Sequence, residues 1–159
     1  MKSSIRKIVV AIDFGDEAED ILHMAGELGR ALSAEIHLVH IYQPDPCSPY
    51  EMMLYPVLIP QETVAGHEAI LRDERRQLRN QAADLREKEV VTFAYMKPLE
   101  GTIPHSILEF VSDLHGDLIL IGTSRPNRLN EMIVGSVAKK VLKESVVPVL
   151  LIPRRIGKG

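Results

Sequence analysis

The chain has 159 residues, of which 45% are hydrophobic and 26% charged, and its formal net charge is −3 at pH 7. This length predicts a single domain over residues 1–159 that can bury a core without disulfides or metals. The slightly acidic balance gives no electrostatic reason to expect nucleic acid, because nucleic-acid-binding domains usually show a clear basic excess on one face, so we expect no nucleic-acid partner.

Cysteine content and the first apolar run indicate the compartment. Cys47 is the single cysteine, so no internal disulfide can form, which fits a reducing environment. The apolar run that begins near Lys7 ends at Asp13, which is too short for a secretory signal or a membrane span. We therefore expect a cytoplasmic protein that does not contact the membrane.

The first part of the chain predicts two strands separated by a helix. Residues 7–13 form a β-rich apolar run that ends in a carboxylate, and residues 35–42 form a second such run. Between them, residues 17–32 place apolar side chains at spacings of three and four, the pattern of a helix with one buried face. Gly26 and Gly29 lie inside this helix, and we interpret them as points of close packing against the sheet.

A proline-rich insertion is predicted at residues 43–61. It also contains a run of apolar residues between Met52 and Ile59. A long loop in a compact domain usually serves a function or covers another surface. Two interpretations stay open here: an irregular segment packed on the domain, and a contact surface for a partner.

Helices and strands alternate through the rest of the chain. The predicted elements are a charged surface helix at 62–88, a strand at 90–96, a short helix from 103 that ends with Gly116 as its C-cap, a buried strand at 118–121, a helix at 136–143 with Ser136 as its N-cap, and a strand at 146–152. Strands that alternate with helices imply a parallel α/β sheet with right-handed crossovers.

A proline near the start of the last strand indicates where that strand lies in the sheet. Pro148 cannot donate a hydrogen bond to a neighbouring strand, so this strand should lie at the edge of the sheet. The apolar residues 149–152 would then be exposed on an open edge. We therefore expect a homodimer in which Pro148–Ile152 pairs with the same strand of a second copy about a two-fold axis.

The most informative pattern lies in residues 117–136. A continuously apolar run ends at Gly122, and nine residues separate position 125 from Gly135 and Ser136. Gly122 lets the chain leave the sheet sharply. A strand end and a helix start that meet form an anion site, because free backbone N–H groups and the helix dipole both favour negative charge.

This spacing resembles the nucleotide motif of the universal stress protein family, which is Gly-x-x-Gly, nine residues, then Gly-Ser or Gly-Thr. Gly122, Gly135 and Ser136 match the motif, whereas Arg125 stands at the second glycine. Either the Arg125 guanidinium pairs with a phosphate, or its side chain fills the space through which the backbone approaches one. The sequence leaves both alternatives open.

The resemblance covers nearly the whole chain. The strand that ends at Asp13 resembles the family's first strand, although Gly15 stands where the family often has serine. Glu100-Gly101 resembles the glycine loop before the family's third helix, and residues 147–150 resemble its closing dimer strand. The resemblance implies an open five-stranded parallel sheet of order 3-2-1-4-5 with helices on both faces, the adenine nucleotide alpha hydrolase-like fold, in a homodimer.

The same resemblance implies a site between the ends of the first and fourth strands, where the strand order reverses. Asp13 and the main chain near Val39, with His40 or Ile41 beside it, would hold adenosine, and the glycine loop and helix start would hold phosphates. The implied binding residues are Ala11, Asp13, Val39, Gly122, Thr123, Ser124, Arg125, Gly135, Ser136 and Val137. The ligand would be ATP or another adenine nucleotide, with Mg²⁺ carried on its phosphates if a metal takes part.

Other catalytic patterns are absent from the sequence. It contains neither a P-loop nor a Gly-x-Ser-x-Gly nucleophile elbow. His37 and His40 are three positions apart on a strand, so they point to opposite faces and cannot share a metal ion. We expect no catalytic residues, no metal ligands, and at most slow ATP hydrolysis.

Three functions stay open at this point. The first is an adenine-nucleotide-binding homodimer with a regulatory or stress-response role and little or no turnover. The second is a dimer of the same family that holds no nucleotide and acts as a protein-interaction module. The third is an α/β enzyme for a nucleotide or phosphorylated metabolite, because electron-transfer flavoproteins and adenylate-forming alpha hydrolases share a related sheet.

Overall fold

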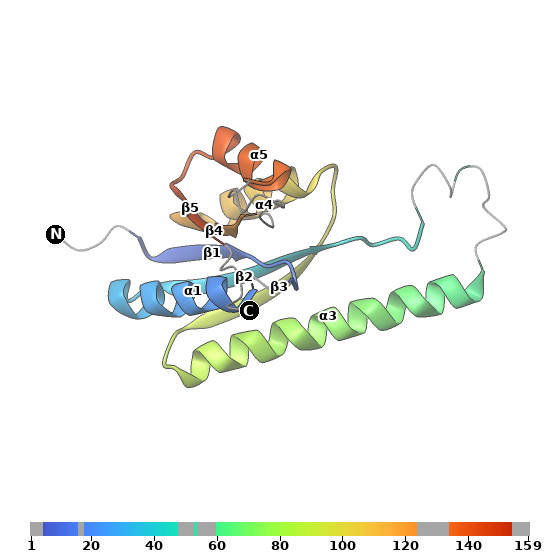
Figure 1. Ribbon diagram of the computed structural model, residues 1–159, viewed down its shortest axis with the longest axis horizontal. Coiled ribbons are helices and arrows are strands. Elements are labelled where there is room, and N and C mark those ends of the chain that lie inside the picture. Colours follow the sequence, from blue (N-terminus) through green and yellow to red (C-terminus); the bar gives the residue numbers. More distant parts are fainter. Residues whose placement is uncertain (1–4, 16–17, 48–52, 54–59, 124–133, 154–159) are drawn as a thin grey trace, which may run out of the picture.

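The computed structural model describes residues 5–15, 18–47, 53, 60–123 and 134–153 (Figure 1). Its strands form one parallel sheet of order β3-β2-β1-β4-β5, which confirms the predicted fold class and strand order. The strands are β1 (Lys7–Ala11), β2 (Glu35–Tyr42), β3 (Thr92–Pro98), β4 (Leu118–Gly122) and β5 (Val149–Ile152). The helices are α1 (Ala18–Leu32), α3 (Gln61–Glu87), α4 (Ile103–Leu114) and α5 (Ser136–Glu144).

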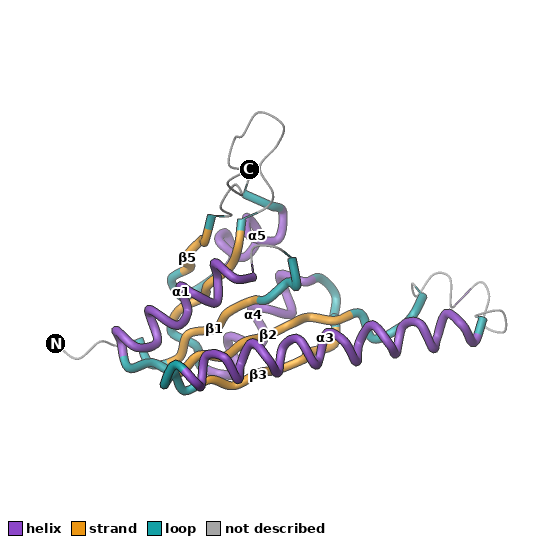
Figure 2. The backbone as a smooth tube through the Cα atoms, turned by 60° about the horizontal axis from the view of Figure 1, so that its bottom comes forward, coloured by secondary structure: helices purple, strands orange, loops and turns teal. Residues whose placement is uncertain are grey.

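β1 forms the centre of the sheet. Its residues Ile8–Val10 pair with Ile36–Leu38 of β2 on one side and with Leu118–Leu120 of β4 on the other. The side chains of Ile8, Val9 and Val10 are completely buried. Helices cover both faces of the sheet (Figure 2), which explains why this run is continuously apolar and does not alternate with polar residues.

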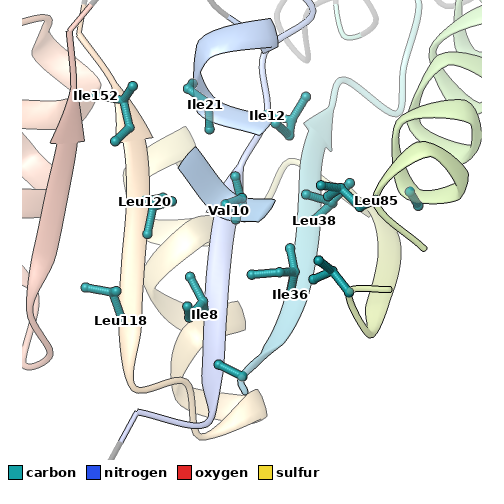
Figure 3. Close-up of a cluster of buried hydrophobic side chains, with 14 of the residues drawn as sticks. Ile8, Val10, Ile12, Ile21, Ile36, Leu38, Leu85, Leu118, Leu120 and Ile152 are labelled. Carbon is teal, nitrogen blue, oxygen red and sulfur yellow. The ribbon is translucent and has the colours of Figure 1, made fainter. Parts of the chain in front are cut away.

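Two apolar clusters fix the helices to opposite faces. The first joins α1 and α3 to even-numbered residues of β1, and Figure 3 shows Ile8 and Val10 beside Ile36 of β2 and Leu120 of β4. The second joins α4 and α5 to odd-numbered residues such as Val9. The division follows from the two-residue repeat of a strand, which sends successive side chains to opposite faces.

α3 is longer than the part of the sheet that it covers. Leu78, Ala82 and Leu85 in its second half are buried, whereas its first half extends beyond the other helices (Figure 1). Ile70 in this first half is 58% exposed. Most of the insertion predicted at 43–61, residues 48–52 and 54–59, lies outside the described residues. None of the helices described here combines the length and the apolar character needed to cross a membrane.

Several predicted boundaries shift by a few residues. His115 is the C-cap of α4 in the left-handed conformation, with φ 56° and ψ 50°, so the prediction of Gly116 at this position was wrong. Gly116 is needed for another reason, since a Cβ there would lie 3.0 Å from Cγ2 of Val9. Ser136 is the first residue of α5 and Gly135 is its N-cap, which corrects the predicted capping role of Ser136.

Both edge strands are shorter at their start than predicted. β3 begins at Thr92 and not at position 90, and β5 begins at Val149 and not at position 146. Pro148 comes just before β5, and its carbonyl accepts a hydrogen bond from the amide of Ile119 at 3.0 Å. β5 lies at the edge of the sheet, as the proline predicted.

Gly29 of α1 lies where the helix approaches the sheet most closely. A Cβ at this position would lie 2.7 Å from Cγ1 of Val90 and 3.2 Å from Cγ1 of Ile36. The first distance is shorter than real Cβ contacts and the second is tighter than most of them, and both neighbours are stiff β-branched side chains. The interpretation of Gly29 as a close-packing residue is confirmed.

We predict that Gly29→Ala lowers the melting temperature. Overpacking costs about 1–3 kcal/mol, and this cost outweighs the gain of about 1 kcal/mol in helix propensity. Gly66→Ala is the matched control, because Gly66 also lies inside a helix but a Cβ there meets no atom within 4 Å. Thermal unfolding followed by circular dichroism should show Gly66→Ala stabilised and Gly29→Ala destabilised. Equal stabilisation of both variants would contradict close packing at Gly29.

Candidate functional site

A pocket of about 330 Å³ opens at the carboxyl ends of the central strands. β1 leads to α1 on one face of the sheet, whereas α5, which follows β4, lies on the other face. In open α/β sheets, the chains that depart in opposite directions leave a crevice at this point. The pocket therefore follows from the strand order.

Eight of the ten binding residues implied by the sequence line this pocket. They are Ala11, Asp13, Val39, Gly122, Thr123, Gly135, Ser136 and Val137. His40 and Ile41, which were expected beside Val39, also belong to the lining. Ser124 and Arg125 lie outside the described residues, so the two alternatives for Arg125 stay open. That these residues bind a nucleotide stays a prediction.

One wall of the pocket was missed by the sequence interpretation. Ile103 and Ile107 of α4 belong to the lining, and Ile107 is 2% exposed. The signal that could have found them is Glu100-Gly101, because this loop leads directly into α4. Gly101 has a φ of 71°, which favours glycine, and the Thr102 side chain then caps the helix by accepting a hydrogen bond from the His105 amide.

The start of α5 is open to the pocket. Gly135, the N-cap, has no side chain, and no side-chain hydrogen bond caps this end of the helix within the described residues. The first N–H groups of a helix lack partners inside it, and they carry the positive end of its dipole. Gly135, Ser136 and Val137 all belong to the pocket lining, so this helix start provides the lining with anion-binding character.

Asp13 and His40 are the titratable side chains among the described lining residues. Asp13 is exposed and lies two residues after the end of β1. The His40 Nδ1 donates a hydrogen bond to the carbonyl of Ile12 at 2.9 Å, and its Nε2 lies 3.4 Å from Oε2 of Glu74 on α3. The pocket thus combines one exposed carboxylate, an apolar wall and an uncapped helix start, a combination suited to binding.

His37 points to the other face of the sheet, as predicted, and does not reach this pocket. Its Nδ1 lies 3.3 Å from the Tyr95 hydroxyl, and its Nε2 lies 3.1 Å from Oε2 of Glu35. Burial lowers the pKa of His37, and this effect outweighs the opposing influence of the nearby Glu35 carboxylate. Within the described residues, no group of three His, Cys, Asp or Glu side chains is placed to hold a metal ion.

Comparison with known proteins gives consistent matches. The universal stress protein MJ0577 of Methanocaldococcus jannaschii is 26% identical over 165 residues, which cover 98% of this chain and 99% of its own. The solved structure of MJ0577 matches with a TM-score of 0.75 at 20% identity, covering 96% of this chain and 99% of that one.

Two further solved structures have nucleotides in their descriptions. The universal stress protein from Archaeoglobus fulgidus in complex with dAMP matches with a TM-score of 0.61 at 23% identity, covering 96% of this chain and 99% of that one. A universal stress protein in complex with cAMP matches with a TM-score of 0.58 at 19% identity, covering 95% and 98%. These likenesses show a shared fold.

A family model gives the assignment. The model of the universal stress protein family matches residues 4–153, which include every strand and helix of the sheet. Because this match spans nearly the whole chain, the protein belongs to the universal stress protein family.

Proposed function

We propose that this protein binds an adenine nucleotide, ATP or AMP, in the pocket between β1 and β4, as a homodimer with a regulatory or stress-response role and little or no turnover. The observation that carries the proposal is the joint presence of Asp13, the apolar wall and the start of α5 in one pocket. The dAMP and cAMP complexes of two structural relatives support it.

The adenosine part of the ligand suits the strand side of the pocket. Val39 of β2 and Ile107 of α4 are almost fully buried and offer apolar contacts for a purine ring. The exposed Asp13 carboxylate can accept hydrogen bonds but cannot donate them, so it matches the ribose hydroxyl groups, which donate hydrogen bonds.

The phosphate part suits the helix start. Gly135 and Ser136 open α5 toward the pocket, and Gly122 ends β4 beside them in the lining. Glycine at positions 122 and 135 leaves the backbone accessible, so phosphate oxygens can approach the N–H groups without a side chain between them. Mg²⁺, where it takes part, would be bound through the phosphates, since Asp13 is the one carboxylate among the described lining residues.

The described lining offers little for hydrolysis. His40 is the natural general base among these residues, but its Nδ1 bonds the Ile12 carbonyl and its Nε2 faces Glu74. A general base must be free to accept a proton from water at the reacting phosphate. The pocket is therefore suited to holding a nucleotide, and turnover would be slow or absent.

The dimer part of the proposal rests on the open edge of β5. The carbonyls of Pro148 and Ile152 accept hydrogen bonds from Ile119 and Thr123, so the backbone at these alternate positions points to β4. The backbone groups of Val149 and Leu151 therefore point away from the sheet, and Leu150 is 37% exposed. A second β5 strand would pair these groups and cover Leu150.

We predict that Asp13→Ala weakens the binding of Mg²⁺-ATP at least about tenfold, because hydrogen bonds to a charged group contribute about 1.5–3 kcal/mol. Isothermal titration calorimetry of protein freed from bound nucleotide measures the effect. Asp84→Ala is the control, since Asp84 is exposed on α3 and is not among the lining residues. No binding heat with the unmodified protein, or equal affinity after Asp13→Ala, would exclude the proposed site.

We predict that Leu150→Lys converts the dimer into monomers, because two-fold pairing of β5 would bring two lysine charges together along the shared edge. Val146→Lys is the control. Val146 is also apolar and exposed, at 98%, but it precedes the strand. Sedimentation velocity should report monomers for Leu150→Lys and dimers for Val146→Lys. A dimer that persists in Leu150→Lys would place the interface elsewhere.

A further inference from the structure

We infer that His40 is the positioning residue for Asp13, and that Glu74 of α3 orients the His40 ring for this role. The inference rests on the proposed function, because it assigns Asp13 to the bound nucleotide. It deepens that function by naming what holds the carboxylate in place. His40 itself need not touch the ligand.

The turn that carries Asp13 lies beyond the regular sheet. The pairing of β1 with β4 ends at Val10, and its pairing with β2 ends at Ala11. After that point the Ile12 amide still donates to the carbonyl of Val39 at 2.9 Å. The Ile12 carbonyl accepts a hydrogen bond from the His40 side chain, and within the described parts of the chain no backbone amide donates to it.

The hydrogen bond fixes the tautomer of His40. A backbone carbonyl can only accept, so Nδ1 must carry a proton, at a distance of 2.9 Å from the Ile12 oxygen. This bond is available to the neutral and to the protonated ring alike. Nε2 lies 3.4 Å from Oε2 of Glu74, and when Nε2 also carries a proton this carboxylate favours the ring orientation in which Nδ1 faces Ile12. His40 is largely buried, with 12% of its side chain exposed, so water competes weakly for these contacts.

His40 also contacts the residue that follows Asp13. The ring centroids of Phe14 and His40 are 4.5 Å apart with an interplanar angle of 42°. Phe14 packs against the first apolar cluster, on the α1 and α3 face. The His40 imidazole therefore contacts both neighbours of Asp13: the backbone carbonyl of Ile12 before it and the side chain of Phe14 after it.

Two local backbone hydrogen bonds stabilise the turn that carries Asp13. The Gly15 amide donates to the carbonyl of Asp13 at 2.7 Å, and the Ala18 amide donates to the carbonyl of Gly15 at 3.1 Å, just before α1. These bonds are local and do not connect the turn to the sheet. The Ile12 amide, which donates to Val39, and the His40 side chain connect the turn to the sheet, so loss of His40 should loosen the turn and let the Asp13 carboxylate leave the pocket.

The test uses two variants of the full chain. His40→Leu removes both polar contacts at similar side-chain volume. His40→Asn keeps an N–H donor attached to Cγ, as Nδ1 is, and so retains the bond to Ile12 while losing the contact with Glu74. Each is titrated with ATP and with 2′,3′-dideoxy-ATP, which lacks the ribose hydroxyls that Asp13 would bind. Amide hydrogen exchange of Ile12 and Gly15 is followed by NMR without nucleotide, with Val10 as the internal reference.

We expect His40→Leu to weaken ATP binding about fivefold to tenfold, less than Asp13→Ala does, because a loosened Asp13 keeps part of its hydrogen bonding to the ribose. Binding of dideoxy-ATP should stay the same, and exchange at Ile12 and Gly15 should become faster while exchange at Val10 does not. His40→Asn should retain the ATP affinity. Unchanged ATP affinity in His40→Leu, or equal weakening of both nucleotides, would overturn the inference.

Failure of the proposed function gives a different result. In that case the unmodified protein binds neither ATP nor dideoxy-ATP, and the nucleotide part of the inference fails with it. The exchange measurement still decides the positioning part on its own. Faster exchange at Ile12 and Gly15 in His40→Leu alone would support it, and unchanged exchange would overturn it.

Discussion

The position of β1 at the centre of the sheet is the constraint on which the other features depend. Its central residues Ile8–Val10 are buried from both sides, so they must be apolar without alternation, and after them the first polar side chain appears only beyond the carboxyl end of the strand. That residue is Asp13. Because the neighbouring connections leave toward opposite faces, the same point is where a crevice opens. The central strand therefore determines both where the pocket lies and which carboxylate enters it.

Residues without polar side chains pack the helices and turns on the sheet and line part of the pocket. Gly29 and Gly116 let α1 and the turn before β4 approach the sheet closely, since a Cβ at either position would lie 3.0 Å or less from a neighbouring side chain. Ile107 closes the pocket from α4, and Gly135 leaves the start of α5 uncapped. His40 connects this arrangement to α3 through Glu74.

Much of this could be predicted from the sequence, for identifiable reasons. The apolar runs of β1 and β4 and the helical spacing of α1 are local patterns, and the nucleotide motif identified Gly122, Gly135 and Ser136. Ile103 and Ile107 were missed because the placement of α4 over the pocket depends on tertiary packing. The position of His40 in the site was anticipated, but its bond to Ile12 spans 28 positions and has no local signal. The sequence interpretation assigned Ser136 to the N-cap of α5, although Gly135 is the N-cap and Ser136 is the first helical residue. The error arose because serine and glycine both serve as N-caps.

A crystal structure of the protein grown with ATP and Mg²⁺ tests the central claim most directly. We predict electron density for one nucleotide per chain, with adenine against Val39 and Ile107, ribose on Asp13, and phosphates at the amides of Gly135 and Ser136. It would also show where Arg125 lies relative to the phosphates. An empty pocket at saturating ATP, or a nucleotide bound elsewhere on the protein, would contradict the proposed function.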